Sequence, residues 1–135
     1  MKGKLIVIEG LDGSGKSTQI ELLKSKLADK TVHQIKLPDY DSSSSTLVKM
    51  YLHGEFGKNP DDVNAYAASA FYAVDRFANF KTKWKNFYDN GDIIISDRYT
   101  TSNAYHQSTK IPRESWSEYF DWLEDFEYNL IGIPK

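Results

Sequence analysis

Residues 4–18 read KLIVIEGLDGSGKST and join an apolar run to a glycine-rich loop. The apolar run, residues 4–9, is continuous, which is typical of a strand buried on both faces in a parallel sheet. Apolar residues then recur at helical spacing and predict a helix over residues 16–28. A buried strand, a glycine-rich turn and a helix in this order predict an α/β fold that begins with a phosphate-binding loop.

The glycine-rich loop matches the pattern G-x-x-x-x-G-K-[ST] in full. Its glycines let successive backbone N–H groups turn inward around a phosphate chain, and the following helix adds positive charge at its N-terminus. The lysine can reach the β- and γ-phosphates of a nucleotide, and the serine hydroxyl can ligate Mg²⁺. A chance glycine-rich turn rarely falls between a buried strand and a helix, so nucleotide binding is favoured. The residues expected to bind ATP are Gly10, Leu11, Asp12, Gly13, Ser14, Gly15, Lys16, Ser17 and Thr18.

Length and composition exclude several other classes of protein. A chain of 135 residues is one domain by size, so we expect a single domain over residues 1–135. Its net charge of −2 gives no global basic field to hold nucleic acid or an anionic membrane. The absence of cysteine excludes disulfides, thiolate metal sites and cysteine nucleophiles. The apolar run near the N-terminus is too short for a signal peptide or a membrane span, which predicts a cytoplasmic protein.

The rest of the chain continues to alternate strands and helices. Weak alternation of apolar and polar residues, ended by Pro38, predicts a second strand at residues 31–37, and a short apolar run predicts a third at residues 92–96. Helical spacing predicts helices at residues 45–52, from Pro60 to about residue 87, at 102–106 and from Pro112 to about residue 126. The resulting order, β-α-β-α-α-β-α-α, predicts a right-handed parallel α/β layer fold.

Asp97 and Arg98 directly follow the third predicted strand. Ligands of open α/β sheets bind beyond the carboxyl ends of the strands, where the glycine-rich loop also lies. An aspartate there can hold Mg²⁺ or its waters, and an arginine can bind phosphoryl oxygens. A surface salt bridge is the alternative. Arg76 lies among aromatic residues of the long helix, and its pattern alone favours a structural role.

Four segments in order resemble thymidylate kinase: GLDGSGKST (10–18), LPDY (37–40), FYAVDRF (71–77) and SDRYTTSNAY (96–105). The resemblance implies a three-layer sandwich of the P-loop NTPase type. Its parallel sheet would have five strands in the order 2-3-1-4-5, of which this chain would hold about three. It also implies transfer of the γ-phosphoryl group of ATP to dTMP, with Mg²⁺, and a homodimer formed through the long helix.

The resemblance implies catalytic roles for Lys16, Arg98, Asp12 and Asp97. Lys16 would act on the transferring phosphoryl group, and Arg98 would touch both donor and acceptor phosphates. Asp12 would contact the 3′-hydroxyl of the acceptor sugar, and Asp97 would join Ser17 at the metal.

The resemblance also implies an acceptor site. Tyr72, where the family usually has phenylalanine, would stack on thymine, and Arg76 would donate a hydrogen bond to its O4 atom. Tyr105 would press on the sugar and so favour deoxyribose. Leu37 and Tyr40 would come from the turn after the second strand, with Tyr40 reaching the acceptor phosphate, while Ser102 and Asn103 would lie at the base edge.

This chain departs from the family pattern at two places. Asp39 stands where many members carry an arginine that holds the acceptor phosphate. Members with glycine at the position of Gly13 take a catalytic basic residue from a lid, which follows a fourth strand in the family. Residues 133–135 fall about where that fourth strand would begin. We therefore expect a C-terminally incomplete domain with poor kinase activity on its own.

Two other functions compete with a thymidylate kinase. One is a non-catalytic module that keeps the phosphate-binding loop and the acceptor pocket. The other is a deoxynucleoside kinase on the same scaffold, because such kinases share part of the loop and arginine motifs. Formation of ADP with dTMP, thymidine or dAMP as acceptor distinguishes the three functions.

Overall fold

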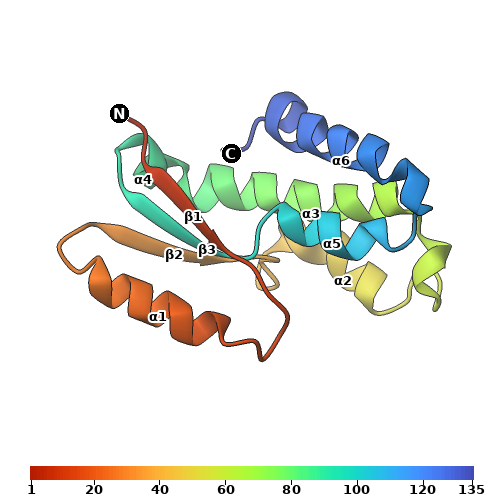
Figure 1. Cartoon of the computed structure of the whole chain (residues 1–135), viewed down its shortest axis with the longest axis horizontal. Coiled ribbons are helices and arrows are strands. Elements are labelled where there is room, and N and C mark those ends of the chain that lie inside the picture. The colour runs from red at the N-terminus through yellow and green to blue at the C-terminus, as the bar shows by residue number, and fades with distance from the viewer.

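The computed structural model describes all 135 residues and contains one parallel sheet of three strands. The strands are β1 (Lys4–Ile8), β2 (Val32–Lys36) and β3 (Ile93–Asp97). Their order is β1-β3-β2, which confirms the expected order 2-3-1 (Figure 1). β3 is hydrogen-bonded on both sides and is almost wholly buried. β1 forms an edge, and none of its residues is fully buried, since Lys4 is exposed and residues 5–8 are partly exposed; the prediction of a strand buried on both faces is therefore wrong here.

Helical segments connect and cover the strands in the expected order. The α-helices are α1 (Lys16–Lys26), α2 (Thr46–Leu52), α3 (Ala65–Asn79), α4 (Lys85–Asp89), α5 (Thr101–Ser108) and α6 (Trp116–Glu124). Short 3₁₀ turns are η1 (Ser43–Ser45), η2 (Pro60–Asp62) and η4 (Arg113–Ser115), and π-helical segments are η3 (Phe80–Trp84) and η5 (Asp125–Ile131). None of these helices has the length and apolar character needed to cross a membrane.

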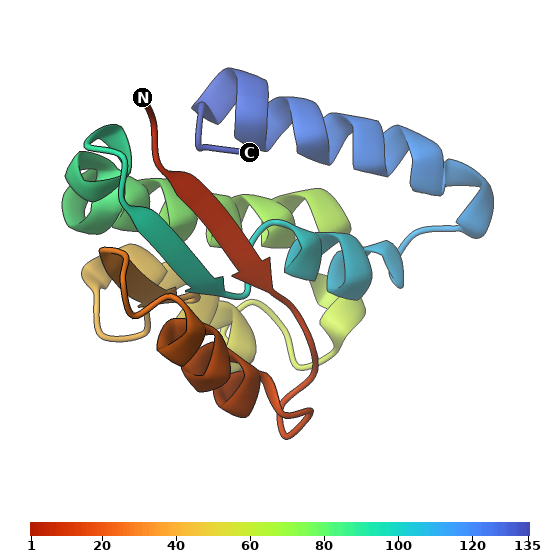
Figure 2. The same ribbon diagram turned by 60° about the vertical axis from the view of Figure 1, so that its left-hand side comes forward.

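Helices lie on both faces of the sheet and produce three layers (Figures 1 and 2). On one face, Ile94 packs in a cluster with Phe80 and Trp84 of η3. Because side chains alternate along a strand, Ile95 points to the other face, which α1 covers with the fully buried Ile20. This arrangement confirms the expected P-loop type of α/β sandwich.

The long central helix begins later than its sequence predicts. Pro60 starts the short turn η2 instead, and Val63 then adopts an extended backbone that interrupts the helical path. Asn64 caps α3 by accepting a hydrogen bond from the backbone N–H of Ala67 at 2.9 Å. Val63 is buried in this extended conformation, so tertiary packing rather than helical spacing sets the backbone here.

The C-terminal segment packs against α3 and then returns to the sheet. Tyr119 of α6 is fully buried beside Ala65 and shares a 2.7 Å hydrogen bond with Ser69. Beyond η5, Ile133 joins the cluster on the sheet, and the Tyr99 hydroxyl donates a hydrogen bond to the carbonyl of Pro134 at 2.7 Å. Residues 116–135 thus pack against α3 and against one face of the sheet.

Candidate active site

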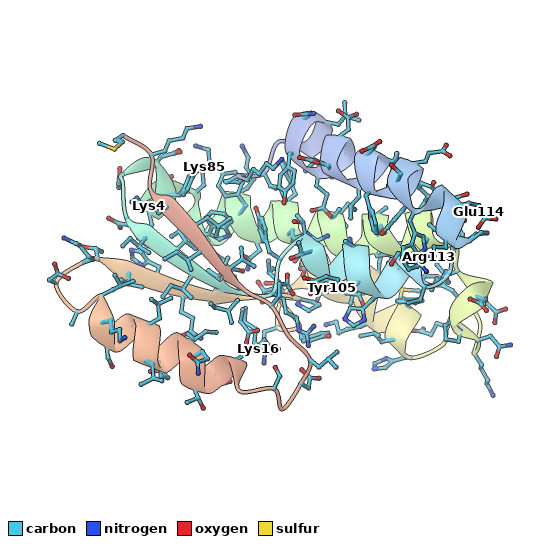
Figure 3. All side chains as sticks on the ribbon, viewed as in Figure 1. Lys4, Lys16, Lys85, Tyr105, Arg113 and Glu114 are labelled. Atoms are coloured by element: carbon cyan, nitrogen blue, oxygen red, sulfur yellow. The ribbon has the colours of Figure 1, made fainter.

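The loop between β1 and α1 has the backbone expected of a phosphate-binding loop. Residues 9–15 form turns and bends with no regular helix or strand. Gly13 and Gly15 adopt positive φ angles of 75° and 94°, which residues with a Cβ atom rarely occupy. Lys16 then starts α1, so its backbone and side chain lie at the N-terminus of an 11-residue helix (Figure 3). The local geometry suits an anionic group.

Lys16 lies between two carboxylates. Its Nζ atom is 3.5 Å from Oδ1 of Asp97 and 3.8 Å from Oδ1 of Asp12. The side chains of Lys16 and Asp97 are about nine-tenths buried, whereas that of Asp12 is exposed. Asp97 Oδ1 is buried and accepts no hydrogen bond. Lys16 is therefore held near the end of β3, and a buried acceptor remains available beside it.

Arg98 links the end of β3 to the phosphate-binding loop. Its Nη2 donates a hydrogen bond to Oδ1 of Asp12 at 3.0 Å, and its backbone N–H donates to the carbonyl of Ile8. Arg98 is the one non-glycine residue with a positive φ angle, 68°. Such backbone strain persists where surrounding contacts fix it, often at functional sites. The hydrogen bond from Arg98, its charge and that of Lys16 lower the pKa of Asp12 below its ordinary value.

Glu9 is a further link that the sequence analysis missed. One carboxylate oxygen accepts hydrogen bonds from the Tyr99 backbone N–H at 2.8 Å and the Thr101 hydroxyl at 2.6 Å. The other accepts from the Ser102 hydroxyl at 2.7 Å. Glu9 therefore ties the end of β1 to the start of α5. No sequence signal distinguished it from an ordinary exposed carboxylate after a strand.

A cavity of about 240 Å³ opens between this region and α3. Its walls come from the glycine-rich loop, the turn after β2, α3 and α5. It contains every residue predicted for the acceptor site except Tyr105: Asp12, Leu37, Tyr40, Tyr72, Arg76, Arg98, Ser102 and Asn103. Segments far apart in the sequence are thus brought to one site, although the individual roles stay predictions.

Tyr105 lies outside this cavity and is 58% exposed on α5 (Figure 3). The next residue, His106, lines the cavity, as does Gln107, whose buried Oε1 accepts no hydrogen bond. Neighbouring residues of a helix point about 100° apart, so Tyr105 and His106 face different directions, and the contact of Tyr105 with the sugar stays a prediction. The geometry brings His106, rather than Tyr105, to the wall where a ligand would lie.

Tyr72 forms an apolar wall of the cavity. Burial raises its pKa to about 12, so its hydroxyl stays protonated at neutral pH. The ring of Tyr51 meets it edge-on, with centroids 6.5 Å apart. Tyr40, at the cavity mouth, is 45% exposed, and burial of the remainder raises its pKa as well. Two neutral phenols therefore line the cavity opposite its charged residues.

Arg76 is almost completely buried and belongs to a polar cluster under the cavity. Its Nε donates to Oε2 of Glu127 at 2.9 Å, and its Nη2 donates to Oε1 of the same carboxylate. Glu127 comes from η5 and was not singled out in the sequence, because a lone glutamate among aromatic residues carries no motif. Arg76 is thus both a structural ion-pair partner and a cavity residue.

Asp39 does not hold a position suited to binding an acceptor phosphate. Its carboxylate accepts hydrogen bonds from Ser42 and Asn79 and forms a 2.6 Å ion pair with Lys83. Burial raises its pKa, but these three partners outweigh that effect and lower it. Lys36, at the end of β2, is exposed, makes no ion pair and lines the cavity. The cation available on this wall is therefore Lys36.

The site offers few protein ligands for a metal. No group of three or more histidine, cysteine, aspartate or glutamate side chains is close enough to hold one. Mg²⁺ usually takes one or two protein oxygens and completes its shell with phosphates and water. The buried Oδ1 of Asp97, which accepts no hydrogen bond, lies beside the phosphate-binding loop and fits such a shell, and the Ser17 hydroxyl lies at the start of α1.

Comparison with known proteins identifies the family. A model of the thymidylate kinase family matches residues 8–119. The chain belongs to the thymidylate kinase family. Its members are nucleoside monophosphate kinases, and the family fold agrees with the parallel sheet and phosphate-binding loop described above.

This thymidylate kinase family chain is 31% identical over 134 residues to the thymidylate kinase of Mycobacterium tuberculosis H37Rv, covering 97% of the chain and 61% of that protein. It is 30% identical over 134 residues to a probable thymidylate kinase of Methanococcoides burtonii, covering 99% and 62%. The chain therefore spans about three fifths of the length of these relatives.

Solved thymidylate kinase structures share its fold. The enzyme from Candida albicans superposes with a TM-score of 0.65 at 30% identity, covering 91% of this chain and 56% of that one. The enzyme from Ehrlichia chaffeensis superposes with a TM-score of 0.63 at 24% identity, covering 94% and 70%. The second likeness supports the fold alone.

Proposed function

We propose that this chain carries the donor loop and acceptor cavity of a thymidylate kinase, which transfers the γ-phosphoryl group of ATP to dTMP and yields ADP and dTDP. The observation that carries the proposal is the contact between Arg98 and Asp12, because it joins the phosphate-binding loop to the wall of the cavity. Phosphoryl transfer requires two anions held in line and neutralisation of the charge between them. Lys16 on the donor side and Arg98 at the junction supply that positive charge.

The cavity supports a pyrimidine monophosphate as acceptor. Tyr72 provides a flat apolar wall for the base, and Arg76 provides hydrogen-bond donors for a carbonyl such as thymine O4. The acceptor phosphate would lie near Arg98 and Lys36, since Asp39 is committed to other partners. His106, next to Tyr105 on α5, lines the cavity and would contact the sugar.

Ser17 and Asp97 would hold Mg²⁺ together with the phosphates of ATP. When bound, the metal neutralises phosphate charge and orients the γ-phosphoryl group. The chain's own contribution is a dry acceptor, Asp97 Oδ1, fixed at the end of β3 and 3.5 Å from the Lys16 ammonium.

The proposed function is tested by ADP formation with dTMP, thymidine or dAMP as the acceptor, alongside calorimetric binding of dTMP. Turnover highest with dTMP supports the thymidylate kinase. Turnover with thymidine alone would instead identify a deoxynucleoside kinase. Binding of ATP and dTMP with little turnover would support both binding sites and agrees with the poor activity expected of this chain on its own. Failure to bind dTMP would refute the assignment of the cavity.

A homodimer through α3 belongs to the same proposal. Val74 and Phe77 of α3 are 44% and 38% exposed, while the polar Asp75 and Arg76 between them are buried. This helix therefore buries polar residues and exposes apolar ones. Apolar side chains that stay exposed on a protein surface are often covered by a second protein. Sedimentation should give twice the chain mass, and Phe77→Glu should restore the single mass. A monomer at all concentrations would contradict this pairing.

A further inference from the structure

Glu127 is a fully buried carboxylate that contacts two residues of the cavity wall, Arg76 and Asn103, and it lies beyond the residues that match the family model. Both of its oxygens accept hydrogen bonds from the guanidinium of Arg76. This two-point contact fixes the plane of the guanidinium as well as its position. It also uses two of the five N–H donors of Arg76, so three remain for other partners.

Glu127 also orients a second cavity residue. Asn103 is 2% exposed, and its Nδ2 donates to the carbonyl of Ser69 at 3.1 Å and to Oε1 of Glu127 at 3.3 Å. An asparagine amide has two N–H donors, and both are engaged. The polar atom of this side chain that remains for a ligand in the cavity is therefore its Oδ1 acceptor.

The cavity thus presents a donor, Arg76, beside an acceptor, Oδ1 of Asn103. Thymine offers the complementary edge, with O4 accepting and N3–H donating. Cytosine offers the opposite edge, with a 4-amino donor and an N3 acceptor. We propose that Glu127 is a positioning residue for base choice, which holds this donor and this acceptor in the order that matches thymine and opposes cytosine. The inference rests on the proposed function.

A purely structural role would make a different prediction. Neutralising the buried charge of Arg76 would explain the ion pair, and its loss would then weaken all ligands alike. Glu127→Gln keeps the shape of the side chain but offers Arg76 one acceptor oxygen and an N–H group that opposes its donors. One glutamine oxygen cannot accept from both Arg76 and Asn103 as the carboxylate does, so the Asn103 amide is held by the Ser69 carbonyl alone and can turn to present an N–H group to the N3 atom of cytosine. If Glu127→Gln loses the preference for dTMP over dCMP, Glu127 positions the base-reading groups. If it weakens both nucleotides equally, Glu127 has only a structural role.

The test is calorimetric binding of dTMP and dCMP to the unaltered chain and to Glu127→Gln. The matched control is Tyr119→Phe, which removes a buried hydroxyl bonded to Ser69 and to the Asn103 backbone but touches neither Arg76 nor Glu127. We expect the ratio of the dCMP Kd to the dTMP Kd to fall by about tenfold in Glu127→Gln, since bonds to charged groups are strong. The control should keep that ratio within about twofold. Equal ratios in all three proteins would overturn the proposal.

Glu127→Asp provides a second route if Glu127→Gln does not fold, as judged by circular dichroism. It keeps the charge on a side chain one methylene shorter, so the carboxylate cannot meet both Arg76 and Asn103 at the same distances. The ratio should again fall, and an unchanged ratio would overturn the proposal. If the unaltered chain and both variants all prefer dTMP to the same extent, the role of Glu127 is refuted but the proposed function is not. An unaltered chain that binds no dTMP refutes the proposed function and this role together.

Discussion

Replacing Lys16 by alanine should abolish tight ATP binding while leaving dTMP binding nearly intact. The Lys16 ammonium is 3.5 Å from a carboxylate oxygen of Asp97, and both side chains are about nine-tenths buried. At an effective dielectric constant of about 20, unit charges at that distance attract by roughly 5 kcal/mol before desolvation is subtracted. Removing the lysine therefore leaves Asp97 as an uncompensated negative charge beside the phosphates.

The net cost of losing one hydrogen bond to a charged phosphate is about 1.5–3 kcal/mol. We expect the ATP Kd of Lys16→Ala to rise by about 10- to 150-fold, since each 1.4 kcal/mol is a factor of ten. Titration of a fluorescent ATP analogue measures this change. Lys24→Ala is the matched control, because Lys24 is also on α1 but is bonded to Glu21 and Gln34. The control should bind ATP as the unaltered chain does.

A second substitution tests the cause of the loss. Asp97→Asn added to Lys16→Ala removes the repelling charge, so in the absence of Mg²⁺ the double variant should bind ATP more tightly than Lys16→Ala. Unchanged ATP affinity in Lys16→Ala would refute the position of the donor site. An equal loss of ATP and dTMP binding would show that the substitution had disturbed the fold, and the argument from local charge would fail.

Three further predictions concern other parts of the molecule. Arg98→Ala should raise the pKa of Asp12 toward its ordinary value in a carboxyl NMR titration, because the hydrogen bond and charge of Arg98 lower it; an unchanged pKa would contradict their contact. Burial raises the pKa of Tyr72 and of Tyr119 from 10.0 to about 12, so the stability this provides is present below pH 10 and is lost as the pH rises through 12. Denaturant unfolding should show that decline, and a flat profile would be inconsistent with it. Trp84→Ala should lower the free energy of unfolding by about 3–5 kcal/mol, because Trp84 is 1% exposed in the core; urea unfolding measures this, and a loss below about 1 kcal/mol would rule out that packing.

The strand-turn-helix unit and the parallel sheet could be predicted from the sequence because their signals are local. The run of residues 4–9 and the glycine pattern each specify a backbone conformation without help from distant residues. The start of α3 could not be predicted in this way. The helical spacing extends back through Val63, and only its tertiary burial shows that the backbone is extended there.

The candidate site was predictable where a motif names its residues and was missed where contacts define them. Glu9 and Glu127 carry no motif, and their significance comes from partners 90 and 51 residues away in the sequence. Tyr105 is the opposite case, a residue that a motif names but that does not line the cavity. A resemblance of segments cannot tell which of two adjacent helical residues faces the cavity, and here His106 does.

The separation of 51 residues between Arg76 and Glu127 has a consequence for folding during synthesis. At about 5–20 residues per second, a ribosome needs roughly 3–10 s to add the stretch between them. Throughout that interval Arg76 lacks the carboxylate with which it is buried in the finished structure. The buried ion pair of the cavity region can therefore form only after η5 has been translated. Slow codons placed just before η5 would lengthen the interval before that ion pair forms.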